Sequence, residues 1–245
     1  MNSLSKICCI VLLFCASDLV TETHAEPIRV VAFGDSTTAQ RGKLKVYCDQ
    51  LRTLFEQVEQ EIEIVNSGVG GNHTDLALER FDRDVLQHAP DVVVMQFGIN
   101  DAAVDVWKNP PATQPRVSLE RYSRNLSEFV EQLQARKIHV ILMTPNPLRW
   151  TEKLKQHYGK LPYCPDDLDG LNVLLTEYSA AVRQIAVRED VILVDVDRAF
   201  RAFDKQPGQS MDALLLDGMH PNEHGHALIA NLLFPELKRR AAPKR

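Results

Sequence analysis

The chain has 245 residues, of which 44% are hydrophobic and 25% are charged, the ordinary balance of a folded soluble protein. This composition excludes a disordered chain, a collagen and a disulfide scaffold. Its 28 basic and 33 acidic residues give a net charge of -5. Nucleic acid is therefore not an expected partner, because a negative body does not neutralise a phosphate backbone.

The first 25 residues have the pattern of a secretion signal. Lys6 precedes an apolar run over 7–16, and Ala25 offers a small residue for cleavage before Glu26. An uncleaved anchor is disfavoured because the run is about half of the roughly 20 apolar residues that span a bilayer. We therefore expect a cleavable signal peptide, 1–25, and a secreted or periplasmic protein without stable membrane insertion.

The segment 26–245 contains no Gly/Ser-rich linker, internal repeat or low-complexity stretch, which predicts a single domain. It keeps two of the five cysteines, Cys48 and Cys164. In an oxidising compartment these could form a disulfide, or they could stay as two separate buried thiols, and the sequence leaves both options open. Two cysteines cannot build a four-thiolate zinc site.

Apolar runs of strand length alternate with segments of helical period from residue 26 onward. In most of these runs the apolar residues are nearly continuous, as in parallel strands that are covered on both faces. The second run, 62–66, alternates apolar with charged residues and suits the edge of a sheet. The expected strands are 29–33, 62–66, 91–97, 139–144 and 191–196.

Apolar residues recur at helical spacing between the expected strands. The predicted helical stripes are 44–58, 77–85, 119–133 and 171–185, with a last helix at about 223–234 that Pro235 stops. Regular alternation of strand and helix predicts an α/β protein: a three-layer αβα sandwich around a flavodoxin-like, doubly wound parallel sheet of order 2-1-3-4-5. Two long connections, 102–117 and 145–170, leave the carboxyl end of this sheet, where open α/β folds bind ligands.

Polar residues follow the first strand at Gly34-Asp35-Ser36-Thr37. A serine on a glycine-assisted turn at a strand end can present its Oγ to solvent, as a nucleophile requires. A turn-forming or helix-capping role explains the same residue, so this motif alone is weak evidence.

The second strand leads into a glycine-rich loop with Gly68, Gly70 and Gly71. Such a loop permits positive φ and can aim a backbone N–H at a developing oxyanion. A phosphate cradle is less consistent, because His73 stands where a dinucleotide motif needs its last glycine and no Gly-Lys-Ser/Thr follows. A plain turn is the remaining alternative.

Two further motifs complete the set. Asn100 follows the third strand and can donate its amide N–H to an oxyanion, although capping or turn formation would also explain it. Asp217 precedes His220 by three residues, so its carboxylate can reach the Nδ1–H of the ring and leave Nε2 as a base. In the order 2-1-3-4-5, Ser36, Gly71 and Asn100 leave adjacent strand ends and would converge on one crevice.

With these motifs in this order, the chain resembles the SGNH hydrolase superfamily, the GDSL esterases and lipases, over essentially all of the mature segment. The resemblance implies a serine esterase in which Ser36 is the nucleophile, His220 the general base and acid, and Asp217 its orienting partner. It also implies an oxyanion hole of the Ser36 N–H, the Gly71 N–H and the Asn100 side chain, with Gly68 or Gly70 as substitutes if the loop register differs.

The implied ester hydrolysis proceeds through an acyl-enzyme and requires no cofactor and no metal. Rings and charges in the two long connections, such as Trp107, Arg149 and Tyr158, favour an acetyl or other short-acyl ester of a carbohydrate as the partner molecule. Lysophospholipase, thioesterase and arylesterase activities are alternatives, and a non-catalytic flavodoxin-like phosphate or ligand binder is a further one. Acyl length and oligomeric state are not determined by the sequence.

Overall fold

The computed structural model describes residues 27–241 of the chain. The predicted signal peptide, 1–25, lies outside these residues. Within 27–241, no helix combines the length and the apolar character needed to cross a bilayer.

The core of the fold is a parallel sheet of five strands in the order β2-β1-β3-β4-β5, as predicted. Strand β1 pairs with β2 on one side and with β3 on the other, so that Val30 lies between Ile64 and Val92. The strand with alternating charged residues, β2, lies at the edge of the sheet as expected. The strands are β1 Ile28–Gly34, β2 Ile62–Gly68, β3 Val92–Gln96, β4 His139–Met143 and β5 Ile192–Val194.

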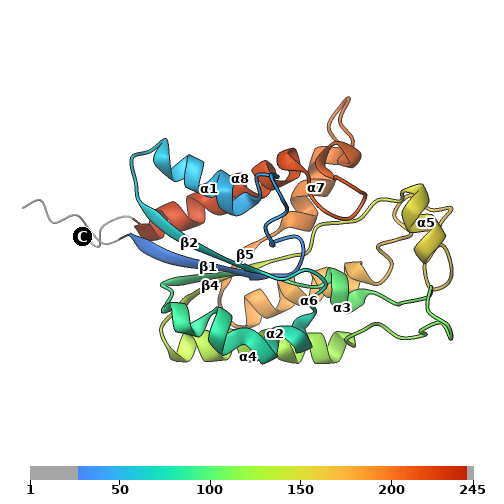
Figure 1. The fold of residues 1–245 in the computed structure, drawn as a ribbon, viewed down its shortest axis with the longest axis horizontal. Helices are drawn as coiled ribbons and strands as arrows, with labels where there is room; N and C mark the ends of the chain where they lie inside the picture. Colours follow the sequence, from blue (N-terminus) through green and yellow to red (C-terminus); the bar gives the residue numbers. More distant parts are fainter. Residues whose placement is uncertain (1–26, 242–245) are drawn as a thin grey trace, which may run out of the picture.

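Helices cover both faces of the sheet and complete the predicted three-layer sandwich. Figure 1 shows α1, α7 and α8 on one face and α2, α4 and α6 on the other. The α-helices are α1 Tyr47–Glu56, α2 Thr74–Asp84, α3 Ile99–Ala102, α4 Leu119–Ala135, α5 Glu152–Tyr158, α6 Leu175–Arg188, α7 Val196–Asp204 and α8 Glu223–Ala241. Single 3-10 turns lie at Leu86–His88 and Met211–Leu214.

Alternate side chains of each central strand enter different cores, which explains the continuous apolar runs. Val31 and Phe33 of β1 pack under α2, α4 and α6, whereas Val30 and Ala32 pack under α1 and α8. Phe33 lies with its ring centroid 5.1 Å from Phe97 and is fully buried. Both faces of the sheet are therefore closed to solvent. The segments with Ser36, Gly71 and Asn100 follow the carboxyl ends of β1, β2 and β3.

The prediction that Pro235 stops the last helix is wrong. Helix α8 continues to Ala241 with Pro235 inside it. A proline interrupts a helix because it removes a backbone donor and crowds the preceding turn, at a cost of about 3 kcal/mol or more. Pro235 faces solvent, whereas Phe234 packs edge-on against Phe55 with ring centroids 5.1 Å apart and Leu237 is fully buried. Packing against α1 therefore outweighs the local preference.

The fifth strand is shorter than predicted because Asp195 begins a helix that the sequence pattern did not reveal. Asp195 caps α7 by accepting a hydrogen bond from the Arg198 N–H at 3.1 Å. Val196, expected at the end of the strand, is therefore the first residue of α7. A capping carboxylate satisfies a backbone donor that the helix leaves unpaired, which favours helix over strand at this point.

Cys48 and Cys164 are separate thiols in the structure. Cys48 is buried on α1, and burial raises the pKa of its thiol to about 12. Cys164 is exposed in the connection that follows β4. The structure therefore contains the unpaired option, but the expectation that both thiols are buried is wrong for Cys164.

Arg80 of α2 joins the ends of the two strands that precede the candidate motifs. Its guanidinium donates to the carbonyl oxygens of Gly34 and Ser67, each at 2.8 Å, and to Asn72 Oδ1 at 2.6 Å. The side chain is 6% exposed, lies 4.5 Å from the Phe33 ring centroid and pairs with Asp84. Removal of this cation would leave several buried acceptors without a donor.

We expect Arg80→Met to lower the free energy of unfolding by about 3–5 kcal/mol, the usual effect of removing one partner from a buried ion pair. Urea unfolding followed by circular dichroism measures the change. Arg83→Met is the control, because Arg83 is exposed and pairs with the same Asp84, and it should unfold near the parent midpoint. Equal midpoints for the two variants would contradict a structural role of Arg80.

Candidate active site

The site lies at the carboxyl end of the sheet, where four segments distant in the sequence meet. The turn after β1 carries Ser36, and the loop after β2 carries Gly71. Helix α3, directly after β3, carries Asn100, and the segment before α8 carries His220. The predicted convergence of adjacent strand ends is thus present in the structure.

Ser36 lies in a tight turn that a buried carboxylate organises. Asp35 Oδ1 accepts hydrogen bonds from the backbone N–H and the hydroxyl of Thr37, each at 2.8 Å, and the Ala39 N–H returns to the Asp35 carbonyl at 3.0 Å. Asp35 is 1% exposed, and burial raises its pKa although these hydrogen bonds oppose the shift. The turn therefore holds Ser36, which is half-buried, at the rim of the sheet.

A second tight turn orients the histidine. Asp217 Oδ1 accepts from the backbone N–H of Met219 at 3.1 Å and of His220 at 2.9 Å. Gly218 at the centre of this turn has φ +83°, and a Cβ there would lie 2.4 Å from the Arg149 carbonyl oxygen. Only glycine fits both conditions, which explains its place between the acid and the base.

The two turns bring three side chains into a continuous chain of hydrogen bonds. His220 Nε2 lies 2.9 Å from Ser36 Oγ, and His220 Nδ1 lies 2.8 Å from Asp217 Oδ2. Burial opposes ionisation of Asp217, but its hydrogen bonds from His220 outweigh burial and hold its pKa well below the usual range. With its Nδ1 proton directed at this carboxylate, His220 presents the Nε2 lone pair to the serine hydroxyl.

The glycine-rich loop supplies unengaged backbone donors beside Ser36. The Gly68 N–H donates to Asn66 Oδ1 at 3.0 Å and is therefore occupied. Within residues 27–241, no hydrogen bond is found from the N–H groups of Gly70 and Gly71. A Cβ built at Gly70 would lie 4.0 Å from Ser36 Cβ, so the loop passes by the serine at Gly70. The next residue, Gly71, has φ +76°.

Two charged side chains hold the amide of Asn100 from opposite ends. Asn100 Nδ2 donates to Asp35 Oδ2 at 3.2 Å, and Asn100 Oδ1 accepts from Arg116 Nη1 at 3.0 Å. This arrangement fixes which end of the amide carries the N–H groups, and the second Nδ2 hydrogen stays available to a ligand. Asp35 thus contacts both the Ser36 turn and Asn100.

Arg116 is a site residue that sequence reasoning missed. Its guanidinium forms a two-pronged ion pair with Asp105, 2.7 Å from Arg116 Nη2 to Asp105 Oδ1, and Lys108 pairs with the same carboxylate. These ion pairs outweigh burial and lower the pKa of Asp105. The sequence shows that the connection 102–117 is unusually long, but no periodic pattern within it singles out Arg116.

Asp101 of α3 forms hydrogen bonds with the first residue of α2. Its Oδ1 accepts from the backbone N–H and the hydroxyl of Thr74 at 2.8 and 2.6 Å, which ties α3 to the start of α2. Burial, with a contribution from nearby Asp35, raises the pKa of Asp101 to about 7. The carboxyl group is thus a structural link between the loop that contains Gly71 and the helix that contains Asn100.

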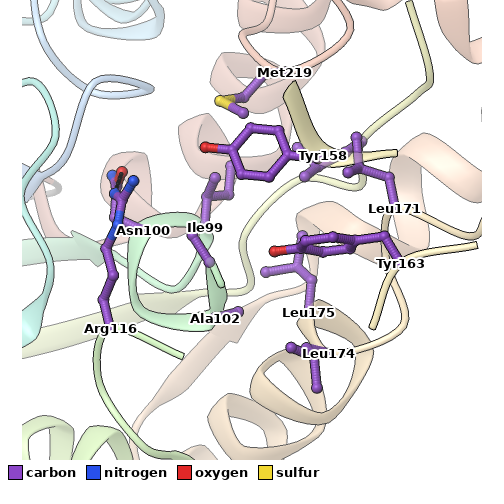
Figure 2. Close-up of a pocket in the computed structure, with 12 residues that line it drawn as sticks. Ile99, Asn100, Ala102, Arg116, Tyr158, Tyr163, Leu171, Leu174, Leu175 and Met219 are labelled. Carbon is purple, nitrogen blue, oxygen red and sulfur yellow. Dashed lines mark hydrogen bonds between the residues drawn. The ribbon is translucent and has the colours of Figure 1, made fainter. Parts of the chain in front are cut away.

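A cavity opens beside Asn100, between α3 and the segment that runs from α5 to α6. Figure 2 shows Asn100 and Arg116 side by side at one end of it and leucines at another. The volume open to the centres of water-sized molecules is about 60 Å³. The lining residues are Ile99, Asn100, Ala102, Ala103, Arg116, Leu148, Tyr158, Tyr163, Leu171, Leu174, Leu175 and Met219.

This lining differs from the polar wall that the sequence suggested. Arg149, expected among the substrate-facing charges, is 3% exposed and pairs with Asp169 at 2.6 Å and Asp204 at 2.5 Å. Its function is to join the connection after β4 to α7. Leucines form much of the wall instead: Leu171, Leu174 and Leu175 belong to the predicted stripe 171–185, which the sequence suggests only as a cover of the sheet, and Leu148 comes from the start of the same connection.

His226 lies on α8, the helix that follows the turn of Asp217 and His220, and it is a buried titratable group. It is 3% exposed, its ring centroid is 6.2 Å from that of Tyr47, and its Nδ1 has no hydrogen-bond partner among the described residues. Burial lowers its pKa to about 4, and the positive charge of nearby Arg41 adds to the shift. His226 is therefore neutral in the folded protein near neutral pH.

Within 27–241 no group of three or more His, Cys, Asp and Glu side chains is arranged to hold a metal ion.

Comparison with known proteins gives one family match that covers most of the chain. The family described as GDSL-like Lipase/Acylhydrolase matches residues 32–228. This range contains every candidate residue from Ser36 to His220.

Named relatives and solved structures agree with this match. The chain is 32% identical over 200 residues to the uncharacterized lipoprotein YqeF of Bacillus subtilis (strain 168), covering 76% of this chain and 77% of that protein. It is 26% identical over 229 residues to an acetylxylan esterase of Geobacillus stearothermophilus, covering 92% and 93%. A lipase/acylhydrolase structure from Enterococcus faecalis superposes with a TM-score of 0.69 at 25% identity, covering 89% and 99%.

The neutral, buried state of His226 predicts a pH-dependent stability. An unfolded histidine titrates near pH 6.5, whereas folded His226 titrates near 4, so between these values the unfolded state binds more protons. The free energy of unfolding should therefore rise with pH across this window, and its His226 contribution of roughly 3 kcal/mol should be lost as pH falls from 6.5 to 4.

Urea unfolding between pH 4 and 7.5 measures this contribution as the difference between His226→Gln and the parent. Asp101 changes the stability in the opposite direction in the same window, because its raised pKa makes the folded state hold the extra proton. This contribution is present in both proteins and cancels when the stability of the variant is subtracted from that of the parent. The exposed His88→Gln is the matched control. Parallel stability curves for His226→Gln and the parent would refute the prediction.

Proposed function

The chain belongs to the GDSL-like lipase/acylhydrolase family and is a carboxylic ester hydrolase, and we propose that it works through an acyl-enzyme formed on Ser36. The observation that carries this proposal is the 2.9 Å contact between His220 Nε2 and Ser36 Oγ, backed by Asp217 at 2.8 Å. This is the geometry that an activated serine nucleophile needs.

In the first half-reaction Ser36 Oγ forms a bond to the ester carbonyl carbon, and its proton passes to His220 Nε2. The imidazolium that results is stabilised by the Asp217 carboxylate, whose low pKa keeps it ionised. The bond between the carbonyl carbon and the alcohol oxygen then breaks, and His220 returns the proton to that oxygen. The alcohol leaves and the acyl group stays on Ser36.

In the second half-reaction a water molecule replaces the alcohol. His220 removes a proton from the water, whose oxygen bonds to the acyl carbon, and the bond to Ser36 Oγ breaks as the serine recovers its proton. The products are a carboxylic acid and the free enzyme.

The negative oxygen that develops in both steps faces donors from three strand ends. We assign these donors to the N–H groups of Ser36 and Gly71 and to Asn100 Nδ2. The Gly68 N–H already donates to Asn66 Oδ1 and therefore does not serve as the oxyanion donor. The Gly70 N–H is the remaining alternative to that of Gly71. Because Asp35 and Arg116 hold the Asn100 amide in place, this donor needs no reorganisation when charge develops.

The proposed substrates are short-acyl esters of carbohydrates, with acetyl as the smallest acyl group. The support is the similarity to an acetylxylan esterase and the exposed indole of Trp107, 46% exposed, whose centroid is 5.2 Å from that of His157. Exposed flat rings of this kind favour the apolar faces of sugars. Esters of lipids or aryl alcohols are the alternative substrates.

We further propose that residues 1–25 are a cleaved signal peptide and that 26–245 form a single hydrolase domain outside the cytoplasm. The sequence pattern of the first 25 residues supports this location. Mass spectrometry of the protein purified from the culture medium or periplasm would identify its first residue, expected to be Glu26.

Ser36→Ala should lower kcat for a chromogenic ester by roughly 10³-fold or more and leave the fold intact, because the attacking atom is lost. Labelling with a fluorophosphonate should add one probe to the parent and none to this variant. Ser123→Ala on α4, whose hydroxyl only bonds to the Leu119 carbonyl, is the matched control. Retained turnover in Ser36→Ala would remove the nucleophile assignment.

Asn100→Ala should reduce kcat by roughly 10²- to 10³-fold with a smaller effect on KM, since an oxyanion donor acts mainly in the transition state. Steady-state kinetics on the same ester separates the two parameters. The exposed Asn231→Ala on α8 serves as the control and should match the parent. If only KM changes, Asn100 binds substrate and does not stabilise the oxyanion.

A further inference from the structure

The cavity beside Asn100 is larger and more apolar than an acetyl group requires. We propose that it is the acyl-binding pocket and that the enzyme prefers linear or branched aliphatic acyl groups of several carbon atoms to acetyl. This inference rests on the proposed esterase function and specifies the acid part of its substrate.

The chemistry of the walls favours a hydrocarbon occupant. Leu171 and Leu175 are buried, Leu174 is half-buried, and Ile99 and Ala102 close the side nearest the sheet. The volume open to the centres of water-sized molecules is about 60 Å³. This is several times the roughly 10–15 Å³ that a single water molecule needs, so the cavity admits more than the methyl group of an acetyl. An aliphatic chain would bury apolar surface on both sides.

Two polar groups in these walls, the Tyr163 hydroxyl and the Arg116 guanidinium, already have partners within the protein. The Tyr163 hydroxyl accepts the Val104 N–H at 2.8 Å, and the Arg116 guanidinium is shared between Asp105 and Asn100 Oδ1. Arg116 is therefore neutralised where it faces the cavity. A polar or anionic occupant would have to displace these contacts, whereas a hydrocarbon leaves them unchanged.

The position of the cavity assigns it to the acyl side of the ester. Asn100, the proposed oxyanion donor, and Met219 form part of its wall, whereas Ser36 and His220 do not, so the cavity extends away from His220 on the Asn100 side of the site. The leaving alcohol must reach His220 Nε2 to receive its proton. The substituent that enters the cavity is therefore the one that stays on the carbonyl carbon after the alcohol has left.

The walls are held firmly enough to discriminate between chain lengths. Asn172 accepts from the Leu148 N–H at 2.7 Å and donates to the Leu148 carbonyl at 2.9 Å, which binds the two ends of the connection after β4 to each other. The Cys164 N–H donates to the Gly170 carbonyl at 3.1 Å and closes the loop between the tyrosines and the leucines. A fixed wall should produce a sharp limit of acyl length.

The test is a series of 4-nitrophenyl esters from acetyl to decanoyl, in which the leaving group is constant and only the acyl group changes. We expect kcat/KM to rise about three- to fourfold for each added methylene until the cavity is full and then to fall. Butyryl should therefore exceed acetyl by roughly tenfold. A series in which acetyl is the best substrate would overturn the proposal.

Two variants locate the effect. Ala103→Leu should fill the cavity and lower the hexanoyl-to-acetyl ratio by roughly tenfold while acetyl turnover continues, and Leu174→Ala should shift the optimum to longer chains. The exposed Ala202→Leu on α7 adds the same atoms outside the cavity and should leave the series unchanged. If either folded cavity variant reproduces the parent series, the cavity does not bind the acyl group.

Hexanoate binding, measured by calorimetry on the parent and on Ala103→Leu, separates this proposal from the esterase function. Binding by the parent that weakens in Ala103→Leu supports the pocket. If binding of this kind occurs and no ester is cleaved, the esterase proposal fails and the apolar site remains. If esters are cleaved with a flat series and hexanoate does not bind, the pocket proposal fails and the esterase remains.

Discussion

The arrangement of the site depends on one buried carboxylate. Asp35 accepts two hydrogen bonds from Thr37 with one oxygen, which shapes the Ser36 turn, and one from Asn100 with the other. A carboxylate has enough acceptor sites to serve both partners at once, so Asp35 links the Ser36 turn to the Asn100 amide. Burial raises the pKa of Asp35, and these donors are what offset the cost of an ionised group there.

Further buried polar contacts hold the ends of the strands and the neighbouring helices together. Arg80 joins the ends of β1 and β2, and Asp101 ties α3 to α2. The proposed nucleophile Ser36 therefore lies on a turn directly after β1 and Asn100 on the short helix after β3, whereas the connections 102–117 and 145–174 carry most of the proposed substrate walls. This division lets the proposed chemistry stay constant while the walls determine which acyl group fits.

Much of this organisation was determined by the sequence itself. The continuous apolar strands required two covered faces, and the alternating strand at 62–66 required an edge, which the structure confirms in β2. The spacing of Asp217 and His220 limited them to a single turn, and parallel strand ends had to bring Ser36 and Asn100 to one edge. These features follow from local periodicity and short-range geometry, which a single chain carries residue by residue.

Only the tertiary structure decided the features that depend on distant partners. Packing of Leu237 against α1 carries α8 through Pro235, and the pairing of Arg116 with Asp105 brings an arginine from an irregular connection to Asn100. Arg149 is buried by Asp169 and Asp204, and leucines from separate segments form the cavity. Such contacts join residues without a fixed spacing, so no pattern in the sequence specifies them before the chain is folded.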